Sequence, residues 1–225
     1  MILTAHQPTY LPWLGLFDKI GSADTYVSFN QAQYEPRGFQ NRNLIKTTSG
    51  ELWLTVPVLK SGHRKVPMSD IKINNQLPWQ RKHWRSITHH YSKAPYFEEI
   101  SLVLQPFYNR EWETLVELNE AMLVTFLGLL RIEVEFLYAS DYKFKGRNSA
   151  LVADMCRQLK ADSYVFGGEG KDYANPEDFK GITLLFQEYN HPTYPQLQGG
   201  FVSHLSIIDL LMNCGPGSLE ILETT

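Results

Sequence analysis

Cysteine is scarce in this sequence and long apolar runs are missing, and each absence excludes a class of protein. Only two of the 225 residues are cysteines, and Cys156 and Cys214 are too far apart to match a metal-binding spacing. We expect both thiols to be reduced and packed, which favours the cytoplasm. The most apolar stretch, residues 121–130, is too short to cross a bilayer and lies between Glu120 and Arg131. The first residues have strand character, so we also expect no signal peptide.

Motifs that would identify a metal site or a familiar hydrolase are also missing. The sequence has no H-E-x-x-H or paired-cysteine pattern. His83 and His90 share one predicted helix face, but they would lie about 10.5 Å apart along the helix axis, too far to bind one ion through bonds of about 2 Å. No G-x-S-x-G elbow, Walker A loop or dinucleotide fingerprint occurs. The sequence therefore predicts no metal site.

Charge is unevenly distributed along the chain. The hydrophobic content of 43% and aromatic content of 13% are typical of a folded protein. The net charge is only −3, but residues 37–93 contain eleven Lys and Arg residues against two acidic ones, a local charge of +9. This asymmetry predicts a small anionic ligand, most plainly one with a phosphate, near the basic segment. The alternative is a solvated basic face without a partner.

The first fifteen residues predict a strand, a tight turn and a helix. Residues 2–6 form a short apolar run, and Pro8 ends it because proline cannot continue a central strand. The polar pair His6 and Gln7 then lies at the carboxyl end of the strand, where ligands bind in open α/β sheets. We predict His6 and Gln7 as catalytic residues, the first moving a proton and the second orienting substrate, with Tyr10 as a substrate contact. The alternative is a buried structural histidine.

The remaining pattern predicts one α/β domain over residues 1–225. A strand at 24–30 after the first helix gives a βαβ unit, hence a parallel pair. Further strands are expected at 51–58, 134–139, 163–166 and 182–189, and further helices at 148–159 and from Ser203 as N-cap. Residues 76–131 read as an inserted helical subdomain, most clearly over 111–130. The fold class expected is α/β, with a mainly parallel Rossmann-like (nucleotidylyltransferase-like) sheet and an inserted helical block.

Amides and cations follow the second strand on what the pattern predicts as a loop-to-helix stretch. Arginine can bind phosphate or carboxylate through two hydrogen bonds, and lysine adds a point charge. The stretch can therefore form a polar wall that accepts an anion, unless its amides only cap neighbouring backbone. The residues predicted to bind substrate are Asn30, Gln31, Gln33, Arg37, Asn41, Arg42 and Lys46.

Two further segments are candidate ligand contacts. Residues 166–173 place a glycine-rich turn after a short strand, and we predict Gly167, Gly168 and Tyr173 as substrate-binding because glycine lets backbone amides approach a ligand. The alternative is a plain turn that needs positive φ. The aromatic and amide side chains of residues 187–204 suit sugar or base contacts, but they also suit ordinary loop packing.

Four blocks of sequence together resemble the WbqC-like family. They are residues 6–15 (HQPTYLPWLG), 41–46 (NRNLIK), 54–57 (LTVP) and 205–215 (LSIIDLLMNCG), and they reach almost from one end of the chain to the other. The glycine-rich turn followed by Tyr173 also fits. The resemblance implies a small bacterial protein of surface-polysaccharide (O-antigen type) biosynthesis, and it supplies no catalytic residues.

An analogy to nucleotidylyltransferases and class I synthetases is limited to the fold. A histidine ends the first strand there too, but this sequence lacks a second histidine at H-x-G-H spacing. Our hypothesis is a cytoplasmic transferase that moves a small acyl or aminoacyl group or acts on a nucleotide-activated sugar, with a nucleotide or acyl donor as co-substrate. The alternative is a non-catalytic binder of a nucleotide or nucleotide-sugar. A nucleic-acid partner is least favoured because the overall charge is acidic and no recognition motif occurs. The oligomeric state stays open.

Overall fold

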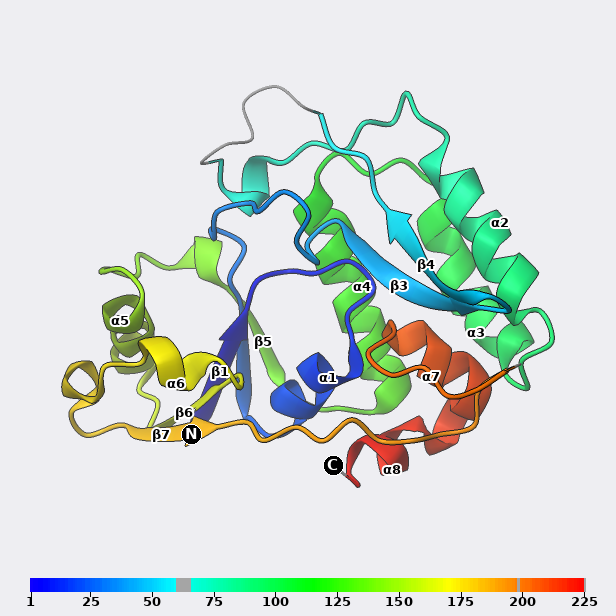
Figure 1. Cartoon of the computed structure of the whole chain (residues 1–225). Coiled ribbons are helices and arrows are strands. Elements are labelled where there is room, and N and C mark those ends of the chain that lie inside the picture. Colours follow the sequence, from blue (N-terminus) through cyan, green and yellow to red (C-terminus); the bar gives the residue numbers. More distant parts are fainter. Residues whose placement is uncertain (60–65, 198, 225) are drawn as a thin grey trace.

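A five-stranded parallel sheet forms one end of the computed structural model, which describes residues 1–59, 66–197 and 199–224 (Figure 1). Each neighbouring pair of strands in it is parallel, and the order is β5-β2-β1-β6-β7. The strands are β1 (Ile2–His6), β2 (Thr25–Ser28), β5 (Glu135–Tyr138), β6 (Ser163–Phe166) and β7 (Thr183–Phe186). The predicted α/β, Rossmann-like fold class is confirmed.

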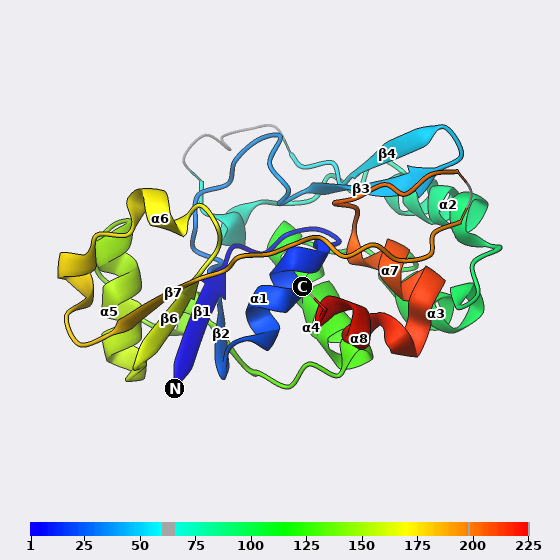
Figure 2. The ribbon, with the colours of Figure 1, turned by 60° about the horizontal axis from the view of Figure 1, so that its bottom comes forward.

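Helices cover both faces of the sheet. On one face α5 (Ser149–Leu159) packs in a cluster with Leu3 and Val27, and the short α6 (Gly170–Tyr173) follows the glycine-rich turn. On the other face α1 (Leu14–Gly21) and α4 (Leu115–Leu130) pack in a second cluster. Figure 2 shows the sheet between these two sets. The side chains of β1 therefore have a different helix partner on each face.

The other end of the molecule is a lobe built on an antiparallel hairpin. It contains β3 (Arg42–Thr47) and β4 (Gly50–Thr55), with α2 (Trp79–Tyr91), α3 (Phe97–Leu104), α7 (Ile207–Cys214) and α8 (Ser218–Leu222) (Figure 1). Short 3-10 helices cover Met68–Asp70, Gln105–Tyr108, Ala139–Asp141, Pro176–Phe179 and Gly215–Gly217. The helices of the predicted insertion share one apolar cluster with α1 and α7.

Two sequence predictions about this lobe are wrong. Residues 42–47 form a strand rather than a loop entering a helix, because they pair antiparallel with residues 50–55, from Arg42 opposite Thr55 to Thr47 opposite Gly50. An amide occupies an apolar position there, since Asn43 Nδ2 donates to the Leu11 carbonyl over 2.6 Å. The last long helix has Ser206, not Ser203, as its N-cap, because His204 has a φ of 59° and cannot belong to a helix.

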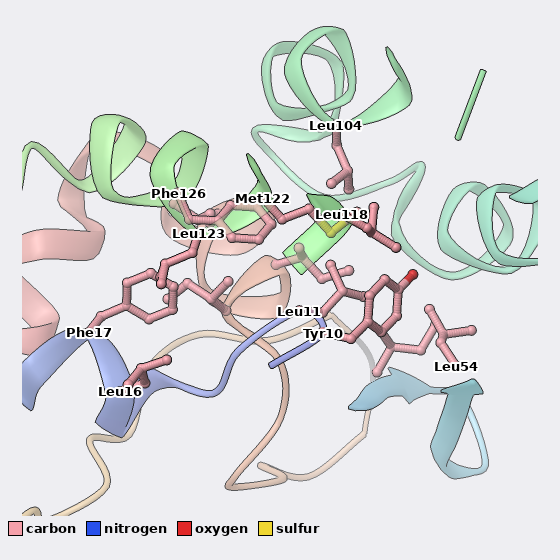
Figure 3. Close-up of a cluster of buried hydrophobic side chains, with 14 of the residues drawn as sticks. Tyr10, Leu11, Leu16, Phe17, Leu54, Leu104, Leu118, Met122, Leu123 and Phe126 are labelled. Atoms are coloured by element: carbon pink, nitrogen blue, oxygen red, sulfur yellow. The ribbon is translucent and has the colours of Figure 1, made fainter. Parts of the chain in front are cut away.

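The segment that leaves β1 is anchored in this lobe. Figure 3 shows the Tyr10 ring among Leu11, Leu54 and Leu118 in the apolar cluster. The Tyr10 hydroxyl lies 2.9 Å from His83 Nδ1 and 2.7 Å from the Tyr108 hydroxyl. The turn that follows the catalytic candidates is therefore held by the core rather than by solvent-exposed loop contacts.

Asp209 ties the C-terminal segment to the lobe through a buried carboxylate. It is fully buried and accepts hydrogen bonds from the Tyr91 hydroxyl at 2.8 Å, the Tyr194 hydroxyl at 2.9 Å and Gln196 Nε2 at 2.8 Å.

Within the described ranges, no helix has both the length and the apolar character that crossing a bilayer requires.

We predict that Asp209→Ala lowers the free energy of unfolding by roughly 3–5 kcal/mol, because three buried donors lose their acceptor. Asp209→Asn keeps one acceptor oxygen and should cost about half as much. Urea unfolding followed by circular dichroism measures both variants. A loss below about 1 kcal/mol in the alanine variant would contradict the assigned network.

Candidate functional site

A cavity of about 970 Å³ lies over the carboxyl ends of β1 and β6. Numbered in chain order, the five strands cross the sheet as 3-2-1-4-5, so the order reverses between β1 and β6. Crevices at such a reversal are where open α/β sheets bind ligands. Topology and cavity thus identify the same place, and His6 lies in its wall.

His6 is held as a neutral ring in this wall. Its Nδ1 lies 2.7 Å from the Gln7 carbonyl, and because a carbonyl can only accept, Nδ1 carries the proton. The neutral ring therefore keeps Nε2 unprotonated. Burial, followed by the nearby charge of Lys19, lowers the pKa of His6 to about 3. At neutral pH the side chain is neutral and Nε2 can accept a hydrogen bond, but a pKa of about 3 makes it a weak base in the free protein.

Lys19 is a second polar residue of the wall, and the sequence predictions did not include it. Its side chain is 5% exposed, and Nζ donates to the Ala5 carbonyl at 3.0 Å. Burial lowers the pKa of Lys19 to about 8, so it is mostly charged at pH 7. Within the described chain no carboxylate pairs with it. The available signal was its position on α1, one turn after Gly15 and on the side facing the end of β1.

Gln7 is oriented by a chain of amides. Its Oε1 accepts a hydrogen bond from Gln40 Nε2, and Gln40 Oε1 accepts one from the backbone N–H of Glu35 at 2.7 Å. Gln40 Nε2 also donates to the Gln33 carbonyl at 3.3 Å. Gln7, Gln33 and Gln40 all line the cavity. Because Gln7 uses its oxygen internally, its amide NH₂ is the group it can offer to a ligand.

The glycine-rich turn forms another side of the cavity. Gly167, Gly168 and Tyr173 all line it. A Cβ on Gly170 would lie 2.3 Å from Phe166 Cβ, whereas one on Gly167 would meet nothing within 4 Å. The turn's glycines do not have positive φ, so the alternative of a plain positive-φ turn is wrong. Close packing against Phe166 requires glycine at position 170, whereas the space beside Gly167 lies open toward the cavity.

The rest of the wall is apolar on one side and aromatic on the other. The apolar side comes from α5 and its neighbours, through Leu151, Val152, Met155, Phe29 and Phe166. On the aromatic side, Trp13 meets Tyr189 edge-on with ring centroids 5.2 Å apart. Beside them Gln187 Nε2 donates to the Gly15 carbonyl at 2.8 Å and to Asp18 Oδ2. The arrangement suits a ligand with both a polar and an apolar part.

Four predicted binding residues are buried in structural contacts outside the cavity wall. Tyr10 lies in the lobe core, as described. Asn30 Nδ2 donates to Glu120 Oε1 and to the Ser140 hydroxyl, each at 3.2 Å. Asn41 Nδ2 donates to the Val56 carbonyl at 2.9 Å. Lys46 Nζ donates to Gln196 Oε1 at 3.0 Å and to the Gly200 carbonyl at 2.7 Å.

Three more of the predicted binding residues lie outside the cavity wall and nearer the surface. Gln31 and Arg37 are exposed, and Arg37 has a φ of 72°. Arg42 donates to the Arg37 carbonyl and its guanidinium lies 4.2 Å from the Trp53 ring centre. Gln31, Arg37 and Arg42 are not among the described residues that line the cavity. Residues 60–65, which contain three cations of the basic segment, lie outside the described ranges.

The family model described as the WbqC-like protein family matches residues 7–221. The chain belongs to this family. It is also 34% identical over 223 residues to Rv1507c of Mycobacterium tuberculosis, an uncharacterized protein, across 96% of this chain and 95% of that one. The family is thus shown over nearly the whole length, and the relative's name states no activity.

We predict that Lys19→Met stabilises the protein at pH 7. The folded-state pKa lies below the unfolded value of 10.5, so burying the charge costs free energy in full below pH 8, and the cost vanishes as pH rises past 10.5. The shift corresponds to about 3 kcal/mol, and the lost hydrogen bond to Ala5 offsets part of it, leaving a gain of about 1–3 kcal/mol.

Urea unfolding at pH 7 and at pH 10 tests this expectation, with the gain smaller at the higher pH. Lys82→Met, which removes an exposed charge on α2, is the matched control and should change stability by less than about 0.5 kcal/mol. A Lys19→Met protein that is less stable than wild type at pH 7 would show that the ammonium is compensated in the fold.

Proposed function

We propose that this protein is a transferase of bacterial surface-polysaccharide biosynthesis that works in the cavity at the end of β1. It would move a small acyl or aminoacyl group, or act on a nucleotide-activated sugar. Membership of the WbqC-like family supports the broad setting. The cavity of about 970 Å³ supports it further, because that volume is at the upper end of the range that holds ligands of nucleotide-sugar size.

The observation that carries the proposal is the unprotonated Nε2 of His6 in the cavity wall. As the hydroxyl or amine of the acceptor attacks the donor, its proton passes to Nε2 while the bond to the leaving group breaks. His6 then returns that proton to the leaving group, so the ring is neutral again at the end of the cycle. Such general acid–base help contributes on the order of 10²–10⁴-fold to a rate.

Other cavity residues position the reactants in this proposal. The amide NH₂ of Gln7 can donate to the carbonyl or hydroxyl of a substrate, since Gln40 fixes the other end of the amide. The glycine turn lets the ligand approach the backbone at Gly167 and Gly168. Leu151, Val152 and Met155 provide apolar surface for an acyl group or a base. Ligand contacts by Arg37, Arg42 and Lys46 stay a prediction from sequence alone.

Product formation in His6→Gln tests the proposal. Purified protein is incubated with nucleotide-activated amino sugars and acyl-coenzyme A thioesters, and products are followed by mass spectrometry. We expect wild type to form a transfer product and His6→Gln to lose at least about 100-fold in rate with an unchanged circular dichroism spectrum. His90→Gln, a histidine of α2 outside the cavity wall, is the matched control and should keep full activity.

Full turnover by His6→Gln would remove His6 from the chemistry. Binding of a nucleotide or nucleotide-sugar by wild type, without a product from any donor, would instead favour the non-catalytic alternative.

A further inference from the structure

Lys19 is the one side chain of the cavity wall, within the described residues, that combines burial with a cationic group. Buried ammonium groups are costly, and proteins normally pair them with a carboxylate. Here a single backbone carbonyl, that of Ala5, accepts one hydrogen bond from Nζ, and an ammonium has three N–H donors. The group therefore retains donors and charge that its protein neighbours do not use.

The charged groups around Lys19 do not prevent an anion from binding beside it. His6 on β1 is neutral, so it does not repel an anion. The acidic residues of the wall, Glu35 and Glu169, are both exposed, whereas Lys19 is 5% exposed. Asp18 on the same helix is engaged by Gln187. The tyrosines of the wall, Tyr164, Tyr173 and Tyr189, stay protonated at neutral pH because burial raises the pKa of each.

The basic segment is predicted from its sequence to bind an anion through Arg42 and Lys46, but neither of these side chains reaches the cavity. Arg42 donates to the Arg37 carbonyl and packs on Trp53, and Lys46 donates to Gln196 and to the Gly200 carbonyl. Neither residue lines the cavity wall. Among the described residues of the wall, the positive charge available to a ligand is the ammonium of Lys19.

We propose that Lys19 binds the anionic group, a phosphate or a carboxylate, of the ligand that occupies this cavity. This inference rests on the proposed function for the site and names the chemistry of its substrate. The Nζ of Lys19 donates to the carbonyl of Ala5, the residue before His6, so the anion and the reacting bond of the substrate would lie at the same end of β1. The substrate class is therefore an anionic donor or acceptor, rather than a neutral sugar.

Anion binding would also act on His6. The charge of Lys19 is one of the two causes that lower the pKa of His6, the larger being burial. A bound anion offsets that charge, so protonation of His6 becomes less unfavourable once the ligand is present. The histidine would be a better proton acceptor in the complex than in the free protein. Binding and proton transfer are then coupled through one lysine.

Calorimetric titration of the full chain with sulfate, phosphate and acetate tests the proposal. Sulfate keeps its charge across the pH range used, and acetate distinguishes a carboxylate site from one that needs a tetrahedral oxyanion. We expect wild type to bind at least one of the three at pH 7, and Lys19→Met to lose at least tenfold in affinity for it. Lys82→Met removes one exposed cation of the basic segment and should change the affinity less than threefold.

Two further variants keep the result decisive. Lys19→Arg keeps the charge, so it should retain binding, and its affinity should not decline between pH 7 and pH 9 as that of wild type does. Arg42→Met tests the basic segment directly. The proposal is overturned if wild type binds none of the three anions, or if Arg42→Met abolishes binding while Lys19→Met keeps it.

The outcome is separable from that of the proposed function. Loss of product in His6→Gln together with unchanged anion binding in Lys19→Met would retain the transferase and reject the anion site. Lysine-dependent anion binding with full turnover in His6→Gln would retain the anion site and reject His6 as the base.

Discussion

The structure depends on one electrostatic constraint at the end of β1: two basic side chains line one cavity, and only one of them is charged at neutral pH. Lys19 and His6 both lose affinity for protons through burial, and the charge on Lys19 lowers the pKa of His6 further. The Gln7 carbonyl then selects the tautomer by accepting the Nδ1 proton. One residue is left as a cation and the other as a base, and this division supplies the chemistry proposed for the cavity.

The lobe maintains this constraint by holding the segment between β1 and α1. Tyr10 is inserted between His83 and Tyr108, and Asn43 donates to the Leu11 carbonyl. On the other side Asn119 Nδ2 donates to the Gln40 carbonyl at 2.8 Å, which positions the amide that holds Gln7. Residues far from the cavity thus decide where His6 and Gln7 point, as expected for a site supported by rigid surroundings.

The sequence predicts the sheet and the position of His6 at the end of β1 because both follow from strong local rules. A strand that ends in a polar pair before proline can be recognised from neighbours alone, and so can a βαβ connection. The residues of the cavity wall are harder to predict from sequence, because amides and charges are read as exposed. Asn41 and Lys46 are buried instead: Asn41 donates to the Val56 carbonyl, and Lys46 donates to Gln196 and to the Gly200 carbonyl. Lys19 was missed for the same reason, since a lysine on a helix is normally solvated and only the tertiary fold buries this one.

The central claim is that His6 is a neutral base whose proton affinity is set by burial and by Lys19. The most direct test is a nuclear magnetic resonance titration of isotope-labelled histidine in wild type and in Lys19→Met, which reports both the pKa and the tautomer of His6. We expect wild-type His6 to remain neutral, with the proton on Nδ1, to well below pH 5. In Lys19→Met the pKa of His6 should rise but stay below 6.5, because burial persists. A wild-type His6 that titrates near 6.5 and does not respond to the loss of Lys19 would contradict the account.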